Sequence, residues 1–99
     1  METDDKEIIL MQFKTLPGVG KSIAEDLFEM GYRGLNELSQ QDPDDLYQQH
    51  CRIKGQQVDR CFLYVMRCIN YSLNTIHPDK EKLKWWNWND EKIKKERDK

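Results

Sequence analysis

The stretch that decides the fold runs from residue 16 to residue 22 and reads Leu16-Pro17-Gly18-Val19-Gly20-Lys21-Ser22. Pro17 forces Leu16 out of helical geometry and so ends any preceding helix. Gly18 and Gly20 supply the backbone freedom that a tight turn needs. The stretch therefore predicts a short turn between two helices.

Helical signals lie on both sides of this turn. Asp4 is expected to cap the first helix, because Glu7 stands three residues later in the capping-box position. The second helix is expected from about Lys21 to Met30, with Gly31 just beyond its end. The predicted apolar face of the first helix is Ile8, Ile9, Met11 and Phe13. That of the second helix is Ile23, Ala24, Leu27 and Phe28.

Three further helical segments follow. Leu35 to Leu38 predicts a brief helical turn, and Asp42-Pro43 begins a helix that is expected to reach about His50. The longest helix is expected from Gln56 to Asn74, packed on several sides because its apolar face is broad. That face is predicted to contain Val58, Cys61, Phe62, Val65, Met66, Ile69 and Leu73, with Tyr64, Cys68 and Tyr71 beside it. Alternating strand patterns are missing, so the predicted fold class is all-α, a compact bundle of about five helices.

An internal repeat of 35 residues supports this bundle. Laying Gly20 over Gly55 aligns Leu27 with Phe62, so each copy reads as helix, turn, helix. The second turn would be Cys51-Arg52-Ile53-Lys54-Gly55, which keeps only one glycine. We therefore expect two tandem units, of which the second is degenerate.

Length and charge limit the classes of function. The 99 residues fit one domain, expected over residues 1–90, followed by a charged tail at 91–99 that is expected to fray. The net charge is −2 in total, with −3 over residues 1–13 and +2 over residues 77–99. The chain lacks a general positive field for nucleic acid, so any such contact must be local.

The chain ends and the cysteines indicate a compartment. The acidic N-terminus lacks the basic residues of a signal peptide, and no apolar run approaches the length of a membrane span. The odd set of three cysteines fits reduced thiols better than a disulfide framework, and Cys61 and Cys68 are expected to pack as small apolar residues. We expect a cytoplasmic protein with no membrane contact, as a monomer or weak dimer.

The turn also predicts an anion site. The first N–H groups of a helix point along its axis at the positive end of the helix dipole. Gly18 and Gly20 keep side chains away, while Lys21 and Ser22 add a charge and a hydroxyl donor. Gly20-Lys21-Ser22 also imitates the end of a nucleotide-binding P-loop, but Thr15 stands where that motif needs its first glycine and a helix precedes the turn. A plain structural turn is the remaining alternative.

The whole string resembles the helix-hairpin-helix motif of DNA repair and recombination proteins. This resemblance implies that the hairpin contacts a DNA backbone phosphate through Gly18, Val19, Gly20, Lys21 and Ser22. In some members of that class, hairpin carbonyls also hold a monovalent cation. No other cofactor is expected.

A wider resemblance spans about Phe13 to Asp90. Besides the hairpin, it is carried by Asp59-Arg60-Cys61, Leu63-Tyr64, Arg67-Cys68 and Lys84-Trp85-Trp86-Asn87-Trp88. On these residues the chain resembles a family of small bacterial helix-hairpin-helix proteins known as pathogenicity-locus or mitomycin-resistance-like proteins. The name implies no established biochemical activity. It is consistent with DNA repair or a stress response.

The tryptophan segment has two interpretations. Trp85, Trp86 and Trp88 stand among Lys80, Lys82 and Lys84, so they could stack on unpaired bases and steer the backbone. Alternatively, the tryptophans form a lid over an open edge of the core. We expect at least one of them to be exposed beside the first hairpin. Lys82, Lys84, Trp85, Trp86 and Trp88 are therefore candidates for a secondary contact with nucleic acid or a partner.

Other reactive residues predict no chemistry. His50, Cys51, Cys61, Cys68 and His77 lack metal-ligand spacing, so no metal site is expected. His50 is expected to interact with the last carbonyls of its helix. Arg60 and Arg67 are expected to form ion pairs with acids such as Asp59, Glu25 or Asp45, and no acid is placed to act with a base or nucleophile. The sequence thus predicts a non-enzymatic protein that binds DNA, single- or double-stranded, without sequence specificity, or alternatively a protein-interaction module.

Overall fold

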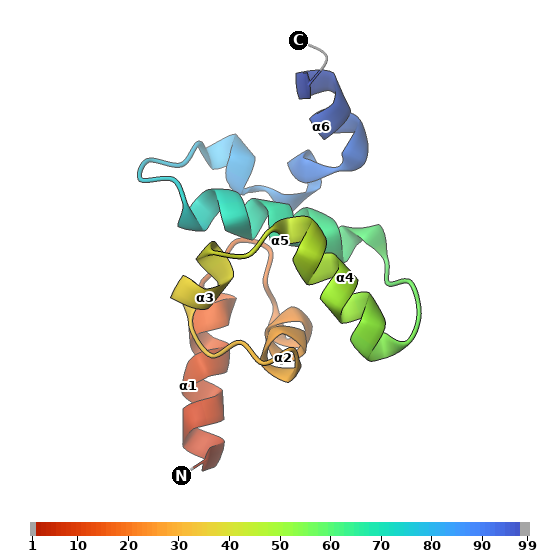
Figure 1. Ribbon diagram of the computed structural model, residues 1–99. Helices are drawn as coiled ribbons and strands as arrows, with labels where there is room; N and C mark the ends of the chain where they lie inside the picture. The colour runs from red at the N-terminus through yellow and green to blue at the C-terminus, as the bar shows by residue number, and fades with distance from the viewer. Residues whose placement is uncertain (1, 98–99) are drawn as a thin grey trace.

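The computed structural model describes the backbone of residues 2–97 and the surroundings of the side chains of residues 5–94. Within this range the chain forms six α-helices, two short 3-10 helices and no strand, which confirms the all-α fold class (Figure 1). The elements are α1 (Glu2–Lys14), α2 (Lys21–Glu29), α3 (Leu35–Ser39), α4 (Pro43–Lys54), α5 (Arg60–Leu73), η1 (Lys80–Leu83), η2 (Trp85–Trp88) and α6 (Asp90–Arg97).

Helix α5 is the centre of the molecule, as its broad apolar face predicts. It packs against α3, α4, η1 and η2, while α1 packs against α2. Its buried residues are Phe62, Leu63, Val65, Met66, Cys68 and Ile69. The molecule measures 51 × 34 × 20 Å, and α1 and α6 project at its opposite ends (Figure 1).

Helix α1 differs from the sequence prediction at its start and on its face. It begins at Glu2, so Asp4 lies inside the first turn instead of capping it. Ile8 and Met11 are 55% and 66% exposed, whereas Phe13 is fully buried. The reason is that the side of α1 that meets the core contains Ile9, Leu10 and Phe13, so Ile8 and Met11 lie outside it on a helix that projects from the body of the protein (Figure 1).

The caps of α2 and α4 agree with the sequence prediction. Gly31 has a positive φ of 104°, and its N–H and that of Tyr32 donate to carbonyls in the last turn of α2 at 3.1 and 3.2 Å. This is a Schellman motif, which glycine favours because it lacks a β-carbon. At the start of α4, the Asp42 carboxylate accepts the N–H of Asp44 at 2.8 Å, with Pro43 in the first helical position.

The predicted second turn is wrong, because residues 51–54 belong to α4. Gly55 has φ +70°, and Gly55 and Gln56 donate to the last turn of α4 at 3.2 Å each. Gly55 therefore ends a helix as Gly31 does, while Gly20, at φ −99°, stands just before one. The alignment of Gly20 with Gly55 consequently joins two glycines with different conformations and different roles.

The longest helix is also shorter than the sequence suggests. Helix α5 begins at Arg60 and not at Gln56, because Asp59 caps it by accepting the N–H of Cys61 at 2.8 Å. The side chain of Cys61 is exposed, which contradicts its predicted packing role, whereas Cys68 is buried. Cys61 lies on nearly the same side of α5 as the buried Cys68 seven residues later. Its exposure therefore goes with its place in the first turn of α5, next to the cap at Asp59, and not with the helical spacing.

The C-terminal segment is helical over part of the predicted tail. Residues 91–97 belong to α6, whose first turn is capped by the Asn89 side chain accepting the N–H of Lys92 at 2.9 Å. Asp98 and Lys99 lie outside the described residues. Along the chain that the structure describes, no helix combines the length and apolar character that crossing a membrane requires.

Candidate nucleic-acid interface

The turn between α1 and α2 is anchored in the core by its apolar residues. Leu16 and Val19 are 6% and 7% exposed, whereas Gly18, Gly20, Lys21 and Ser22 are exposed. The N–H of Val19 donates to the Leu16 carbonyl at 3.3 Å. The apolar residues thus fix the turn, and the polar and glycine residues face solvent.

The start of α2 has backbone donors without a side-chain cap. Gly20 is the N-cap residue in an extended conformation, and its carbonyl accepts the first helical bond, from Ala24, at 3.0 Å. The N–H groups of Lys21, Ser22 and Ile23 precede that bond, and no side chain caps the helix. These groups lie at the positive end of the helix dipole, where an anion is stabilised.

The other long helices with described caps differ from α2 at this point. Asp42 caps α4 and Asp59 caps α5, each accepting a backbone N–H at 2.8 Å, and Asn89 caps α6 at 2.9 Å. The bond from the Cys61 N–H, together with one from the Cys61 thiol, holds the pKa of Asp59 below its usual range. A carboxylate therefore already occupies the start of α4 and of α5, whereas the start of α2 is open.

The tryptophan segment lies against the turn at Gly18. A β-carbon built at Gly18 would lie 2.9 Å from Cδ1 of Trp85. At Gly20, by contrast, a β-carbon would have no neighbour within 4 Å. The position of a β-carbon at Gly18 is therefore occupied by the indole, although the residue is exposed, whereas the corresponding position at Gly20 is open.

The three tryptophans have different surroundings. Trp85 is half-buried against the core, and the Trp88 Nε1–H donates to the Lys82 carbonyl at 2.7 Å while its ring lies 5.4 Å from that of Tyr71. Trp86 contacts Trp85 edge to face, with ring centroids 5.8 Å apart, and is 53% exposed. Trp85 and Trp88 therefore pack as a lid would, while Trp86 presents its ring to solvent.

The side chains of Lys82 and Lys84 each interact with a neighbouring residue. The Lys84 ammonium lies 3.2 Å from the Glu81 carboxylate, and the Lys82 ammonium lies 5.6 Å from the centre of the Tyr71 ring. Both lysines remain exposed. Of the predicted secondary contacts, Trp86, Lys82 and Lys84 are thus accessible at the surface.

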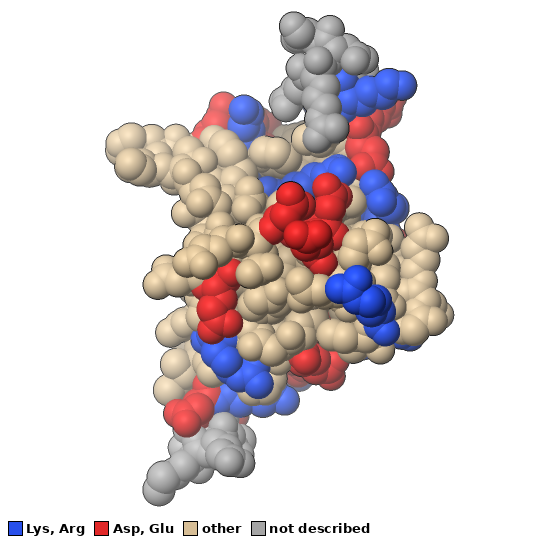
Figure 2. Space-filling view, viewed as in Figure 1, with Lys and Arg blue, Asp and Glu red and all other residues tan. Residues whose placement is uncertain are grey.

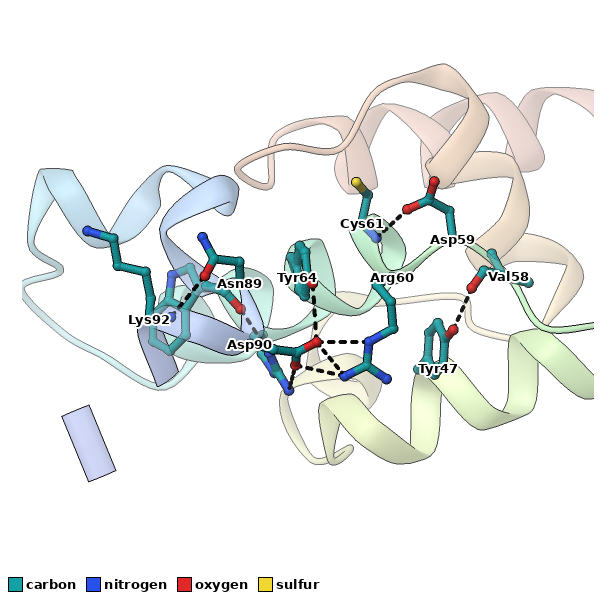
Figure 3. Close-up of polar contacts among 11 residues, drawn as sticks. Tyr47, Val58, Asp59, Arg60, Cys61, Tyr64, Asn89, Asp90 and Lys92 are labelled. Carbon is teal, nitrogen blue, oxygen red and sulfur yellow. Dashed lines mark hydrogen bonds and ion pairs between the residues drawn. The ribbon is translucent and has the colours of Figure 1, made fainter. Parts of the chain in front are cut away.

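Arg60 and Arg67 form ion pairs, but with a residue that sequence reasoning missed. Asp90 accepts bonds from Arg60 at 2.7 to 3.0 Å and from Tyr64 at 3.2 Å (Figure 3). Its carboxylate also lies 3.0 Å from the Arg67 guanidinium. Arg67 also donates to the carbonyl of Trp88 at 2.9 Å. Hydrogen bonding to Asp90 raises the pKa of Arg60, and that from Arg60 lowers the pKa of Asp90.

This group, which we call the Asp90 clamp (Arg60, Tyr64, Arg67 and Asp90), fastens α6 and η2 to α5. The predicted partners Asp59, Glu25 and Asp45 are not those found, because Asp59 caps α5 instead. Asn89-Asp90 is a signal that could have been read from the sequence, since asparagine favours an N-cap position and an acid favours the first turn.

His50 is buried and does not lie at a helix end as expected. It is 3% exposed, its ring stacks on Phe62 with centroids 4.2 Å apart, and its Nε2 lies 3.6 Å from the Asp26 carboxylate. Burial lowers the pKa of His50, and the attraction of Asp26 offsets part of this effect. Because α4 continues to Lys54, His50 is an interior position of the helix and contacts α2 and α5.

One part of the surface is unsuited to phosphate because it is acidic. Figure 2 shows acidic side chains gathered near the centre of the face that it draws, over the start of α4, where Asp42, Asp44 and Asp45 lie. Over the part of the chain that the structure describes, no group of three or more His, Cys, Asp or Glu side chains could hold a metal ion. A monovalent cation at the turn would require its carbonyls, of which that of Leu16 already accepts the Val19 N–H.

Comparison with known protein families gives a match over most of the chain. The model of a family described as Pathogenicity locus matches residues 6–95. No curated protein and no solved structure matches the chain at a significant level.

Proposed function

Because the chain belongs to the Pathogenicity locus family, whose description states no activity, we propose from the site itself that the protein binds DNA without sequence specificity. The turn from Leu16 to Ser22 acts as the hairpin of a helix-hairpin-helix motif and holds one backbone phosphate. The contact uses the N–H groups of Lys21 and Ser22 together with their side chains. The function needs no chemical step.

One observation carries this proposal. Helices α4, α5 and α6 begin with a side chain that accepts the first N–H groups, whereas α2 begins with Gly20 and has no such cap. Uncapped donors at a helix start are exposed to solvent and can take an external anion. Lys21 adds a positive charge at the same place. Val19, whose N–H bonds to Leu16, is left out of the proposed contact.

The acidic net charge makes the contact weak alone and sensitive to salt. Binding to duplex DNA loses affinity with salt in proportion to the number of phosphates neutralised, with a slope of about −0.9 per phosphate. A hairpin with Lys21 and one further lysine would give a slope of roughly −2. A protein that held many phosphates would show a much steeper slope.

Gly20→Asp is the sharpest variant, because it gives α2 the cap that α4 and α5 already have. Gly20 has an extended backbone and open space, so an aspartate fits there without strain. Its carboxylate would accept the free N–H groups and occupy the phosphate position. Stability should stay the same or rise by a few tenths of a kcal/mol, while DNA binding should be lost.

Gly34→Asp is the matched control. Gly34 is the N-cap of α3, with an extended backbone, no side-chain cap and no neighbour within 4 Å of an added β-carbon. The control adds the same charge at a different helix start and should bind labelled oligonucleotides as the wild type does. If both variants bind equally, or if the wild type binds nothing at low salt, the proposal is wrong.

A second candidate function is favoured by the exposed apolar side chains of α1. Ile8 and Met11 are more than half exposed on a helix that projects from the body. Such a face suits a protein-interaction module that has no nucleic-acid contact. If this candidate is right, the wild type does not bind oligonucleotides at low salt and replacing both residues by serine abolishes partner binding, which separates the two functions.

A further inference from the structure

We infer that the DNA held at the hairpin is single-stranded, with one unpaired base stacked on Trp86 beside the phosphate at the start of α2. This inference rests on the proposed function and specifies its substrate. It selects one residue of the tryptophan segment, which as a whole could serve either as a lid or as a binding surface.

Trp86 is linked to the hairpin through its neighbour Trp85. Trp85 lies against Gly18, and the rings of Trp85 and Trp86 are nearly perpendicular, at 84°, with centroids 5.8 Å apart. The Trp86 carbonyl accepts a bond from the Asn89 side chain at 2.8 Å. The exposed indole therefore lies beside Trp85, which is the residue that packs on the turn.

Trp86 is also the most exposed of the three tryptophans, and its ring packs only edge to face on Trp85. Trp85 fills the space above Gly18, and the Trp88 Nε1–H is bonded to the Lys82 carbonyl. Trp86 is 53% exposed, although a large apolar ring gains from burial. The other strongly exposed apolar residues are aliphatic and belong to α1, α4 or the loop at Ile76, so they offer no aromatic face.

The chemistry of stacking selects unpaired bases. In a duplex the faces of the bases are covered by their neighbours, whereas a base in a single strand can place its face on an indole. Such stacking tolerates any sequence, because every base has a π-face. It therefore supplies the second contact that a net acidic protein needs, without requiring a wide basic surface.

Charge around the ring supports a nucleic-acid strand as the occupant. Lys84 directly precedes Trp85 and Trp86 in the chain, Lys21 is the first residue of α2, and both side chains are exposed. Glu81 pairs with Lys84 in the free protein at 3.2 Å. A phosphate would compete with this carboxylate, which makes the contact dependent on salt.

The experiment compares a labelled single strand with a blunt duplex of the same sequence by fluorescence anisotropy at low salt. The wild type should bind the single strand more tightly than the duplex. Trp86→Leu should weaken binding to the single strand roughly 5- to 100-fold and leave duplex binding unchanged, because stacking is lost. Trp86→Phe should retain most of the affinity, since it keeps an aromatic face.

Ile53→Ala provides the matched control, since Ile53 is 52% exposed and lies on α4. It should leave both affinities unchanged. The thermal unfolding midpoint of Trp86→Leu should stay within a few degrees of the wild type, which shows that loss of binding is not loss of fold.

The outcomes separate this inference from the proposed function. One combination of results would show that the inference is wrong and that the proposed function stands. In it, the wild type binds the duplex, Gly20→Asp abolishes duplex binding, and Trp86→Leu binds the single strand as tightly as the wild type does. Equal affinity of the wild type for the two ligands also overturns the inference. If neither ligand binds the wild type, both are wrong.

Discussion

The indole of Trp85 covers Gly18 so closely that a β-carbon there would approach its Cδ1 to 2.9 Å. Gly18 also has φ +78°, a conformation that other residues rarely adopt. The two constraints act together, so this glycine is required by the fold whether or not the turn binds a phosphate. A charge inserted at Gly18 would therefore disturb Trp85 as well as binding.

Gly18→Ala is expected to destabilise the protein by about 1–3 kcal/mol, because alanine is strained at a positive φ and its methyl group displaces Trp85. Gly20→Ala, with an extended backbone and open space, should change the free energy of unfolding by less than about 0.5 kcal/mol. Urea unfolding of the two variants measures the difference. Equal effects would show that Trp85 does not pack on Gly18.

Asp90→Asn is expected to reduce the free energy of unfolding by about 0.5–1 kcal/mol at pH 7, a modest value because the carboxylate is 46% exposed. Hydrogen bonding from Arg60 lowers the pKa of Asp90. The contribution is therefore present above about pH 4 and is lost as the pH falls through the folded-state pKa. Glu91→Gln removes a charge from the same helix end and serves as the control. A difference between Asp90→Asn and wild type that persists after full protonation would contradict the clamp.

Burial lowers the pKa of His50 in the folded protein. As the pH falls below about 6.5, the unfolded chain takes up a proton first, so the free energy of unfolding decreases until the folded-state pKa is passed. His50→Phe should remove this decrease while keeping a ring stacked on Phe62. Asp26→Asn should enlarge it, because the attraction that favours the charged form is lost. Unfolding measured from pH 7 to pH 5 tests this, and identical profiles for wild type and His50→Phe would refute it.

The cysteines should differ in reactivity. Cys61 is exposed, whereas Cys68 is fully buried and its pKa is raised to about 11 by burial. A thiol reagent should modify Cys61 in the native protein and reach Cys68 only after unfolding. Mass spectrometry of digested protein identifies the modified residue, with Cys61→Ser as the control. Rapid modification of Cys68 under native conditions would show that α5 is not packed as described.

Local rules account for much of the fold. Asp42-Pro43 and Gly31 predict helix ends because each acts on its own backbone neighbours, and the structure has both where expected. The apolar spacing along residues 60–73 likewise predicts a central helix. What fails is the register of the repeat, because the sequence does not show that Gly55 closes a helix while Gly20 opens one.

Contacts between residues far apart in the chain could not be predicted from the sequence. The Asp90 clamp joins Asp90 to residues of α5 that precede it by 23 positions or more. Trp85 packs on Gly18, although most of the chain separates the two in sequence. Exposure of Ile8 and Met11 depends on where α1 leaves the body, which their own spacing does not encode. The backbone N–H donors at the start of α2 could be predicted from the sequence. The packing of Trp85 on Gly18 and the exposure of Trp86 could be found only in the structure.

The most direct test of the central claim is a two-dimensional NMR titration of the labelled protein with a short oligonucleotide at low salt. The account predicts that the amide signals of Gly20, Lys21 and Ser22 shift first, and that Gly20→Asp removes these shifts without altering the rest of the spectrum. Added salt should reverse them. No shifts, or shifts confined to other helices, would contradict the account.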